Sequence, residues 1–305
     1  MHVTVGARWS RDERNAEIAE TSESLDTQIV TPGQPGTGDN DFSNFSPSFI
    51  VAYDYSYDVN LYAKFVSGYK TGGFNVRASS IANFEAGFDP EELVSYEIGA
   101  KTTWWDNRLR INAALFQADY DDIQINVQSD INDPSITDVL NAGKAKMAGA
   151  ELEVTALLVE GLTANLNYGY TDADYEEIID ATGQDIADDF RFTNIPKHSY
   201  NLDLEYQFPE LSIGDLVATI GYSWQDEKFS GSSINPDTYI TDDYGMLNAR
   251  LSLSNIAMPQ GDLRIAAWGR NLEDEEYYIA HFNAGVPGAM FGEPRSYGVD
   301  IVYEF

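Results

Sequence analysis

The segment from residue 198 to 208, HSYNLDLEYQF, alternates between apolar and polar residues at almost every step. Tyr200, Leu202 and Leu204 share one parity, and the residues between them are polar. Successive side chains of a β-strand point to opposite faces of a sheet, so this alternation indicates a strand with one apolar and one polar face. A helix, with a repeat of about 3.6 residues, does not produce the pattern.

The same alternation recurs along the whole chain and predicts about twelve strands. Their expected spans are 2–12, 45–56, 59–75, 92–105, 108–128, 138–158, 162–177, 198–208, 215–231, 243–257, 262–276 and 295–305. Most of these spans reach or exceed the roughly ten tilted residues that cross a bilayer. Strands of soluble sandwiches are typically about five or six residues long. The strand lengths therefore favour an all-β, antiparallel transmembrane β-barrel.

The expected connections between these strands alternate in length. The short connections are 57–58, 106–107, 159–161, 209–214 and 258–261. The long ones are 13–44, 76–91, 129–137, 178–197, 232–242 and 277–294. A barrel in an outer membrane has short periplasmic turns and long outer loops. A soluble sandwich has no reason to separate connection lengths in this way.

Aromatic residues lie next to the short connections. Tyr53 and Tyr55 precede the first, Trp104 and Trp105 precede the second, and Phe208 precedes the fourth. An aromatic girdle at the membrane interface has this placement. An ordinary sandwich with aromatic core residues would explain the alternation but neither the strand lengths nor the loop pattern.

The composition excludes several classes of protein. The 305 residues include 18 Lys or Arg against 50 Asp or Glu, so the net charge is −32. Nucleic-acid binders need a basic face, so nucleic acid is not an expected partner. No apolar run approaches the ~18 residues of a membrane helix. Because the sequence has no Cys, disulfides and thiolate metal sites are also excluded.

Four stretches resemble the C-terminal part of TonB-dependent outer-membrane receptors. They are YKTGGFN (69–75), VSYEIGAKTTWWDNRLRINAALFQADYDDIQ (94–124), NAGKAKMAGAELEV (141–154) and RNLEDEEYY (270–278). All four occur in the family's order, and the last strand, ending Tyr303-Glu304-Phe305, resembles the family's closing strand. Together they cover nearly the whole chain.

The resemblance also implies what the sequence lacks. Receptors of this family have a signal peptide, a box that binds the energy-coupling protein TonB, a globular plug and a barrel of about 22 strands. Here only about twelve strands are expected, without box or plug. Residues 1–305 are therefore interpreted as the C-terminal part of the barrel, roughly the last half.

The implied function is energised uptake of a scarce solute, such as a ferric siderophore, across the Gram-negative outer membrane. The implied partners are outer-membrane lipid, the solute, and the TonB complex, which would act through the missing N-terminal part. The barrel-assembly machinery is a further partner, and the resemblance implies that it reads Tyr303 and Phe305 as an assembly signal.

The polar parity of the strands is expected to line the lumen. Its charged members are Lys64, Glu97, Lys101, Glu151, Glu153, Asp203, Glu205, Arg250, Arg264, Arg270, Asp300 and Glu304. Because both signs are interspersed, most of these residues should pair across strands or contact a plug. A minority would contact a passing ligand.

Catalytic and cofactor motifs are absent from the sequence. It has three His, no G-x-S-x-G stretch and no dinucleotide or phosphate loop, so an enzyme is not expected and no cofactor is predicted. Acidic clusters occur in the long connections: Glu17, Glu20, Glu23 and Asp26, then Glu176, Glu177 and Asp180, then Asp185, Asp188 and Asp189. They are interpreted as solvated charge or as oxygen ligands for a divalent cation, and no metal site is assigned.

Two other functions remain open at this point. Twelve is an even number, so the chain could close as a small barrel and act as a passive channel. The chain could also be a soluble extracellular β-protein that binds glycans, although the apolar stripes of Leu, Tyr and Phe argue against this.

Overall fold

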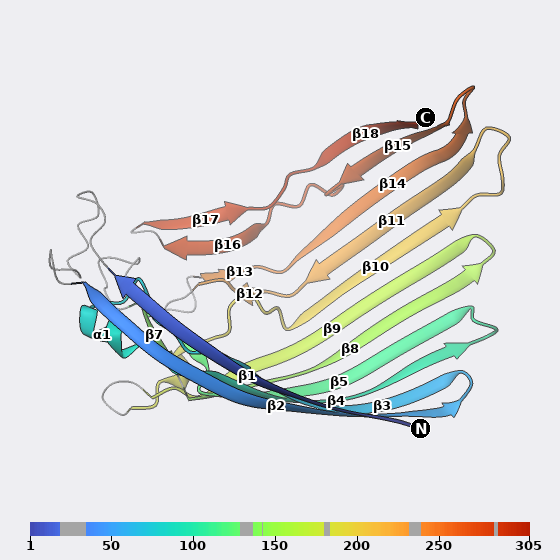
Figure 1. Ribbon diagram of the computed structural model, residues 1–305. Coiled ribbons are helices and arrows are strands. Elements are labelled where there is room, and N and C mark those ends of the chain that lie inside the picture. Colours follow the sequence, from blue (N-terminus) through green and yellow to red (C-terminus); the bar gives the residue numbers. More distant parts are fainter. Residues whose placement is uncertain (19–34, 129–136, 142, 180–183, 232–238, 284–285) are drawn as a thin grey trace.

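A sheet of twelve antiparallel strands dominates the computed structural model, which describes residues 1–18, 35–128, 137–141, 143–179, 184–231, 239–283 and 286–305 (Figure 1). In order across the sheet, the strands are β1 (His2–Ile18), β2 (Gly36–Ser56), β3 (Val59–Lys70), β4 (Glu91–Trp104), β5 (Leu109–Asp121), β8 (Lys144–Val159), β9 (Leu162–Glu177), β10 (His198–Gln207), β11 (Asp215–Gln225), β14 (Tyr244–Ala257), β15 (Asp262–Arg270) and β18 (Ser296–Glu304). This meander confirms the predicted antiparallel all-β class and the strand number.

The long connections gather at one end of the sheet and the short turns at the other, as the alternating lengths predicted (Figure 1). We call these the loop end and the turn end. The loop end carries three hairpins: β6 (Gln124–Gln128) with β7 (Thr137–Asn141), β12 (Lys228–Phe229) with β13 (Ile240–Thr241), and β16 (Tyr278–Asn283) with β17 (Pro287–Phe291). In the described residues, the helical elements are α1 (Ile81–Ala86) and the 3₁₀ turn η1 (Ala187–Asp189). Neither of them, nor any other described segment, is a helix long and apolar enough to cross a membrane.

Tight backbone geometry closes the short turns. Gly161, between β8 and β9, has a φ of 78°, and a Cβ there would lie 2.4 Å from the Gln207 carbonyl oxygen. Only glycine fits that site without strain. The turn between β4 and β5 instead places Trp105, Asp106 and Asn107 at positive φ, so non-glycine residues adopt the left-handed conformation there.

Several predicted strands end earlier than alternation indicated. The predicted span 59–75 stops at Lys70, since Gly72 packs so close to the chain that a Cβ would lie 2.3 Å from the Phe88 carbonyl oxygen. The predicted spans 108–128 and 138–158 break at Asp122 and Gly143, whose φ angles are 54° and 98°. Past these breaks the chain leaves the main sheet and forms the separate β6–β7 hairpin.

Two other predicted strands extend further than expected. The ribbon of β1 and β2 continues through paired residues as far as Ile18 and Gly36, inside the predicted connection 13–44. The predicted connection 277–294 contains the β16–β17 hairpin. Alternation locates the membrane-length part of each strand but not how far its pairing continues beyond it.

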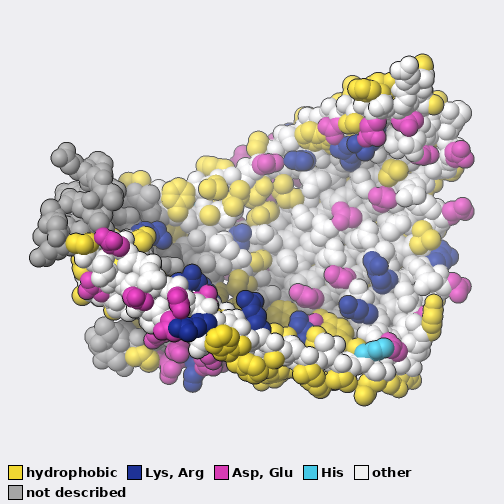
Figure 2. All heavy atoms as spheres, viewed as in Figure 1, with side chains coloured by type: hydrophobic (Ala, Val, Ile, Leu, Met, Phe, Trp, Pro, Cys, Tyr) yellow, Lys and Arg dark blue, Asp and Glu magenta, His cyan; other side chains and the backbone are white. Residues whose placement is uncertain are grey.

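The sheet curves into a trough with chemically different faces. Large apolar side chains such as Val5, Ile98 and Ile301 remain 74%, 58% and 69% exposed. Charged side chains gather inside the hollow of the trough (Figure 2). A soluble sandwich buries its apolar face against a second layer, whereas this face has no described layer over it.

A small buried core lies at the loop end of the sheet. Ile123, Ile125, Ala145, Ile178 and Ala187 form it, and Tyr120, Tyr175, Ile186, Phe190 and Phe192 pack against it. The rings of Tyr175 and Phe192 stack at 4.3 Å. Since these residues come from β5, β6, β8, β9 and the β9–β10 connection, the core ties neighbouring outer connections together.

Strands β1 and β18 form the two ends of the described sheet. In the described residues, β1 pairs with β2 and β18 pairs with β15, and the sheet order does not join β1 to β18. The trough is therefore open between these strands (Figure 1).

Candidate functional site

The polar residues expected to line a lumen share the concave face of the trough. The registers place Lys64 opposite Glu97, and Asp203 opposite Asn165 and Gly221. Continued across the sheet, the same registers put the whole predicted set on this face: Lys64, Glu97, Lys101, Glu151, Glu153, Asp203, Glu205, Arg250, Arg264, Arg270, Asp300 and Glu304. Their role as a lumen lining stays a prediction.

One charged network joins β3 and β4 on the concave face. Lys64 Nζ lies 3.0 Å from Glu97 Oε2, and the Tyr62 hydroxyl donates to Glu97 Oε1 at 2.7 Å. Lys101 Nζ lies over the Tyr62 ring, 5.8 Å from its centroid. The Glu97 carboxylate therefore accepts from two neighbours, which offsets the cost of half-burying it.

A second network joins β14, β15 and β18. Arg250 Nη1 lies 2.9 Å from Asp300 Oδ2, and Trp268 Nε1 donates to Asp300 Oδ1 at 3.2 Å. The Arg270 guanidinium lies over the Trp268 ring at 5.2 Å. Three of the predicted residues thus meet around one tryptophan.

The remaining predicted residues do not join these networks. Glu153 accepts from Asn112 Nδ2 at 3.1 Å, Glu205 accepts from Gln207 Nε2 at 3.2 Å, and Asp203 accepts from Asn201. Outside the two networks, the side chains of Glu151, Arg264 and Glu304 form no hydrogen bond or ion pair with any described residue.

Sequence reasoning missed the aromatic members of both networks, because it selected charged residues only. Tyr62 shares the parity of Lys64, and Trp268 shares that of Arg264 and Arg270. Parity alone would have placed both rings on the concave face. Which charge each ring contacts depends on the register between strands, which alternation within one strand does not contain.

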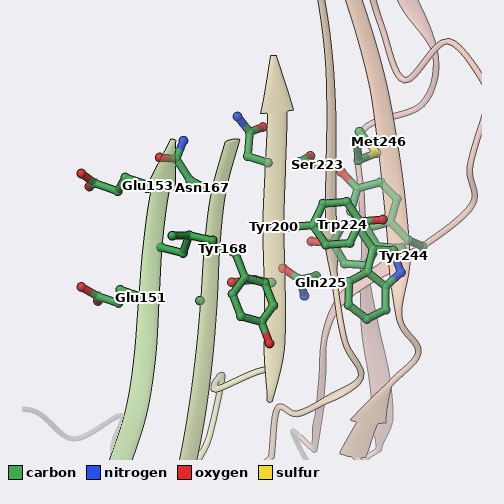
Figure 3. A pocket seen from close by; sticks show the side chains of 15 residues that line it. Glu151, Glu153, Asn167, Tyr168, Tyr200, Ser223, Trp224, Gln225, Tyr244 and Met246 are labelled. Carbon is green, nitrogen blue, oxygen red and sulfur yellow. The ribbon is translucent and has the colours of Figure 1, made fainter. Parts of the chain in front are cut away.

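A cavity of about 600 Å³ lies on the concave face across five strands, β8 to β11 and β14 (Figure 3). Two rows of opposite residues form its floor and sides. The row nearer the loop end is Glu151, Gly169, Ser199, Gln225 and Tyr244. The next row is Glu153, Asn167, Asn201, Ser223 and Met246.

The two sides of this cavity differ in chemistry. The carboxylates of Glu151 and Glu153 stand on β8, and the rings of Tyr244 and Tyr277 stack at 4.1 Å on the opposite side. Small residues, including Gly169 and Ser199, occupy the centre. The cavity is therefore a trough with an acidic side and an aromatic side.

The acidic clusters of the outer connections include one carboxylate with a clear structural role. Asp185 accepts from the backbone amides of Ile178 and Ala187 at 3.1 and 3.0 Å, and these bonds hold the pKa of Asp185 below its ordinary value. Glu20, Glu23, Asp26 and Asp180 lie outside the described residues. Among the residues that are described, no three His, Asp or Glu side chains are arranged to hold a metal ion.

The last strand ends in two neighbouring aromatic residues at the turn end. The Tyr303 hydroxyl donates to the Gln260 carbonyl oxygen, and the rings of Tyr303 and Phe305 lie 5.8 Å apart. Phe305 is 98% exposed. Their role as an assembly signal stays a prediction.

One family model matches most of the chain. Residues 1–272 match the TonB dependent receptor-like β-barrel. The chain belongs to the TonB-dependent receptor family. Proteins of this family lie in the outer membrane of Gram-negative bacteria, where an exposed apolar face suits contact with lipid. A soluble glycan-binding protein is therefore excluded.

Similar sequences include receptors named for metal-pseudopaline and for ferric-pyoverdine. The metal-pseudopaline receptor CntO of Pseudomonas aeruginosa is 28% identical over 265 residues, covering 85% of this chain and 33% of CntO. The ferric-pyoverdine M114 receptor PbuA of Pseudomonas sp. (strain M114) is 26% identical over 214 residues, covering 69% of this chain and 24% of PbuA. The chain thus spans a third or less of the length of these receptors.

Solved structures support the fold. The ferric yersiniabactin uptake receptor FyuA from Yersinia pestis superposes with a TM-score of 0.78 at 17% identity, covering 99% of this chain and 43% of FyuA. The siderophore receptor PiuA from Acinetobacter baumannii gives 0.69 at 19% identity, with 97% of this chain and 40% of PiuA covered. Both superpositions place the twelve-stranded sheet on part of a larger receptor.

Proposed function

We propose that the chain forms the last twelve strands of a 22-stranded receptor that imports a metal chelate, such as a ferric siderophore, with energy from the TonB complex. The observation that carries this proposal is the family match over residues 1–272. Two relatives, named as receptors for metal-pseudopaline and ferric-pyoverdine, support the choice of a chelate. Plug and TonB-binding box would come from the part of the receptor that these residues do not span.

In this proposal the trough supplies about half of the barrel wall. The outer connections and the loop end of the concave face would capture the chelate, and displacement of the plug by TonB would open a path along the wall. The paired charges around Glu97 and Asp300 suit such a wall, because their partners already satisfy much of their charge and they bind a passing anion or cation weakly. No catalytic step is part of this function.

Uptake of radioactive iron tests the proposal. The gene, with whatever coding sequence precedes Met1, is expressed in a Gram-negative host that lacks its own chelate receptors. We expect accumulation of iron-55 from at least one ferric chelate in cells with TonB and none above background in cells without it. Accumulation that is equal in both hosts would reject energised transport.

A passive channel formed by these twelve strands alone is the second candidate, and the even strand number favours it. It requires hydrogen bonds between β1 and β18, because an open edge in hydrocarbon leaves backbone groups unsatisfied at several kcal/mol each. Channel conductance in planar bilayers, measured on the purified 305-residue chain, separates the two functions. Steady conductance independent of TonB supports the channel.

A further inference from the structure

We propose that the trough between Glu151 and Tyr244 is a subsite for a cationic metal chelate, one that carries a protonated amine beside a flat or apolar body. This inference rests on the proposed uptake function and specifies its substrate class. Three features of the cavity carry it: the acidic side, the aromatic side, and a buried amide between them.

The acidic side has no cation of its own. Glu151 and Glu153 both line the cavity, and no Lys, Arg or His is among its lining residues. Within the described residues Glu151 makes no ion pair or hydrogen bond, and Glu153 accepts only from the neutral Asn112. Two carboxylates in a hollow raise the local concentration of positively charged ligands.

Three cations of the neighbouring wall already have partners. Lys64 is paired with Glu97, and Lys101 lies over the Tyr62 ring. On the other side Arg250 is paired with Asp300. At this cavity a ligand amine would meet carboxylates that form no ion pair with any cation among the described residues.

The aromatic side offers a flat apolar surface. Tyr277 comes from the connection after β15 and stacks on Tyr244 with an angle of 27° between the rings. Met246 lines the same side, one row further from the loop end. Stacked tyrosines and a methionine suit the planar or aliphatic part of a chelate.

A buried amide between the two sides lacks a partner. Gln225 Nε2 is shielded from solvent and forms no hydrogen bond with any described residue. Gln225 lies between Ser199 and Tyr244 in the row nearer the loop end, and it lines the cavity (Figure 3). A buried donor without an acceptor is unfavourable. Because the Nε2 atom is shielded, a ligand carbonyl or hydroxamate oxygen would satisfy it only after the Gln225 side chain turns toward the cavity.

The centre of the cavity has room for such a ligand. Three small residues, Gly169, Ser199 and Ser223, line it, and a Cβ added at Gly169 would crowd the Ser199 hydroxyl at 3.3 Å. A volume of about 600 Å³ falls within the range of small-molecule sites, roughly 300–1,000 Å³. Ser199, Gln225 and Tyr244 stand at the loop end of their strands, so a solute that enters between the outer connections would meet this part of the cavity first.

Two ferric chelates that differ by one charge test the inference. Ferrioxamine B carries a free ammonium group, and its N-acetyl derivative is neutral with the same iron centre. Binding of both to the protein as its gene encodes it is measured by calorimetry in detergent micelles, with anionic ferric enterobactin as a third probe. Glu151→Gln is compared with Glu304→Gln, a matched change on the same face far from the cavity.

We expect ferrioxamine B to bind about fivefold more tightly than its acetylated form, the factor expected for one partly exposed ion pair. Glu151→Gln should remove this preference, and Glu304→Gln should keep it. Equal binding of the two hydroxamates, or tighter binding of ferric enterobactin, would overturn the cationic class while leaving chelate uptake intact. Binding of none of the three would count against the proposed function itself, and with it against the subsite.

Discussion

Arg250 and Asp300 form an ion pair that crosses a whole strand. Arg250 is on β14 and Asp300 on β18, and β15 lies between them, yet Nη1 and Oδ2 are 2.9 Å apart. Trp268 on the intervening β15 donates to the same carboxylate. The terminal strand is thus held by side chains of two strands in addition to its backbone ladder with β15.

Asp300→Ala should therefore loosen β18 locally. The two side chains are 42% and 44% exposed, so the pair contributes ~1 kcal/mol or less. We expect amide exchange in β18 to rise by up to about fivefold, with exchange in β8 and β9 unchanged. Glu304→Ala, on the same strand and face without a described partner, is the control. The same increase in both variants would show that the ion pair does not hold the strand.

Asn271 should be the most sensitive residue of the RNLEDEEYY stretch. It is fully buried at a φ of 48°, donates to the Glu275 and Glu293 carbonyls, and accepts from the Glu275 amide. Asn271→Gly keeps the backbone conformation but leaves these groups unbonded, so the local free energy of unfolding should fall by about 1–3 kcal/mol. Hydrogen exchange of residues 271–275 measures it.

The control for this change is Asn255→Gly, at another positive φ of 55°. Asn255 is exposed and its Nδ2 donates to Asp215 at 2.6 Å. Loss of the Asn255 side chain should change the hydrogen exchange of the neighbouring amides much less. If the two variants behave alike, the burial of Asn271 is not what stabilises this turn.

The β9–β10 connection should respond to acid. Asp185 accepts from the Ile178 and Ala187 amides, which lowers its pKa below the ordinary 3.8. A lowered pKa means that the stabilisation is present above pH 3.8 and is lost as the pH falls through the lower folded-state value. The amide shifts of these two residues, followed by NMR between pH 2 and 6 (about the range where carboxylates titrate), should move with a midpoint below 3.8. In Asp185→Asn that transition should be missing.

Spin labels at two adjacent residues test the orientation of the faces. Leu202 lies opposite Leu166 and Tyr222, whereas Asp203 lies opposite Asn165 and Gly221. A slip of one residue would exchange the faces. We expect a label at 202 to be relaxed more by oxygen, which partitions into lipid, and a label at 203 more by a water-soluble nickel complex. The reverse order would reject the assignment.

The alternation of apolar and polar residues predicted the sheet because each strand has one apolar and one polar face along its whole membrane-crossing length. The pattern even accommodates Val302, an apolar residue on the polar parity, which lies opposite Arg264 on the concave face. It failed beyond Lys70 and Arg270, where buried side chains and close backbone contacts end the strands. Those contacts involve residues far away in sequence, such as Phe88 for Gly72 and Glu293 for Asn271.

The cavity could not be predicted from the sequence for a similar reason. Glu151 and Tyr244 are more than ninety residues apart in sequence, and they share a row only because four successive registers align. Each register depends on the turn that joins the two strands. Tyr277 lies beyond the strand that precedes it, in a connection whose path the periodic pattern does not specify.

Replacing Phe305 should impair assembly far more than it impairs stability. The side chain is 98% exposed and contacts the Tyr303 ring, so its packing contribution is small. If the assembly machinery reads the terminal strand, Phe305→Ala in the full-length receptor should lower the yield of heat-modifiable, membrane-inserted protein severalfold. Phe208→Ala removes a comparable aromatic side chain, 38% exposed, at the same turn end and should leave the yield near that of the unchanged protein. Equal yields for the two variants would mean that Phe305 serves only as an interfacial aromatic residue.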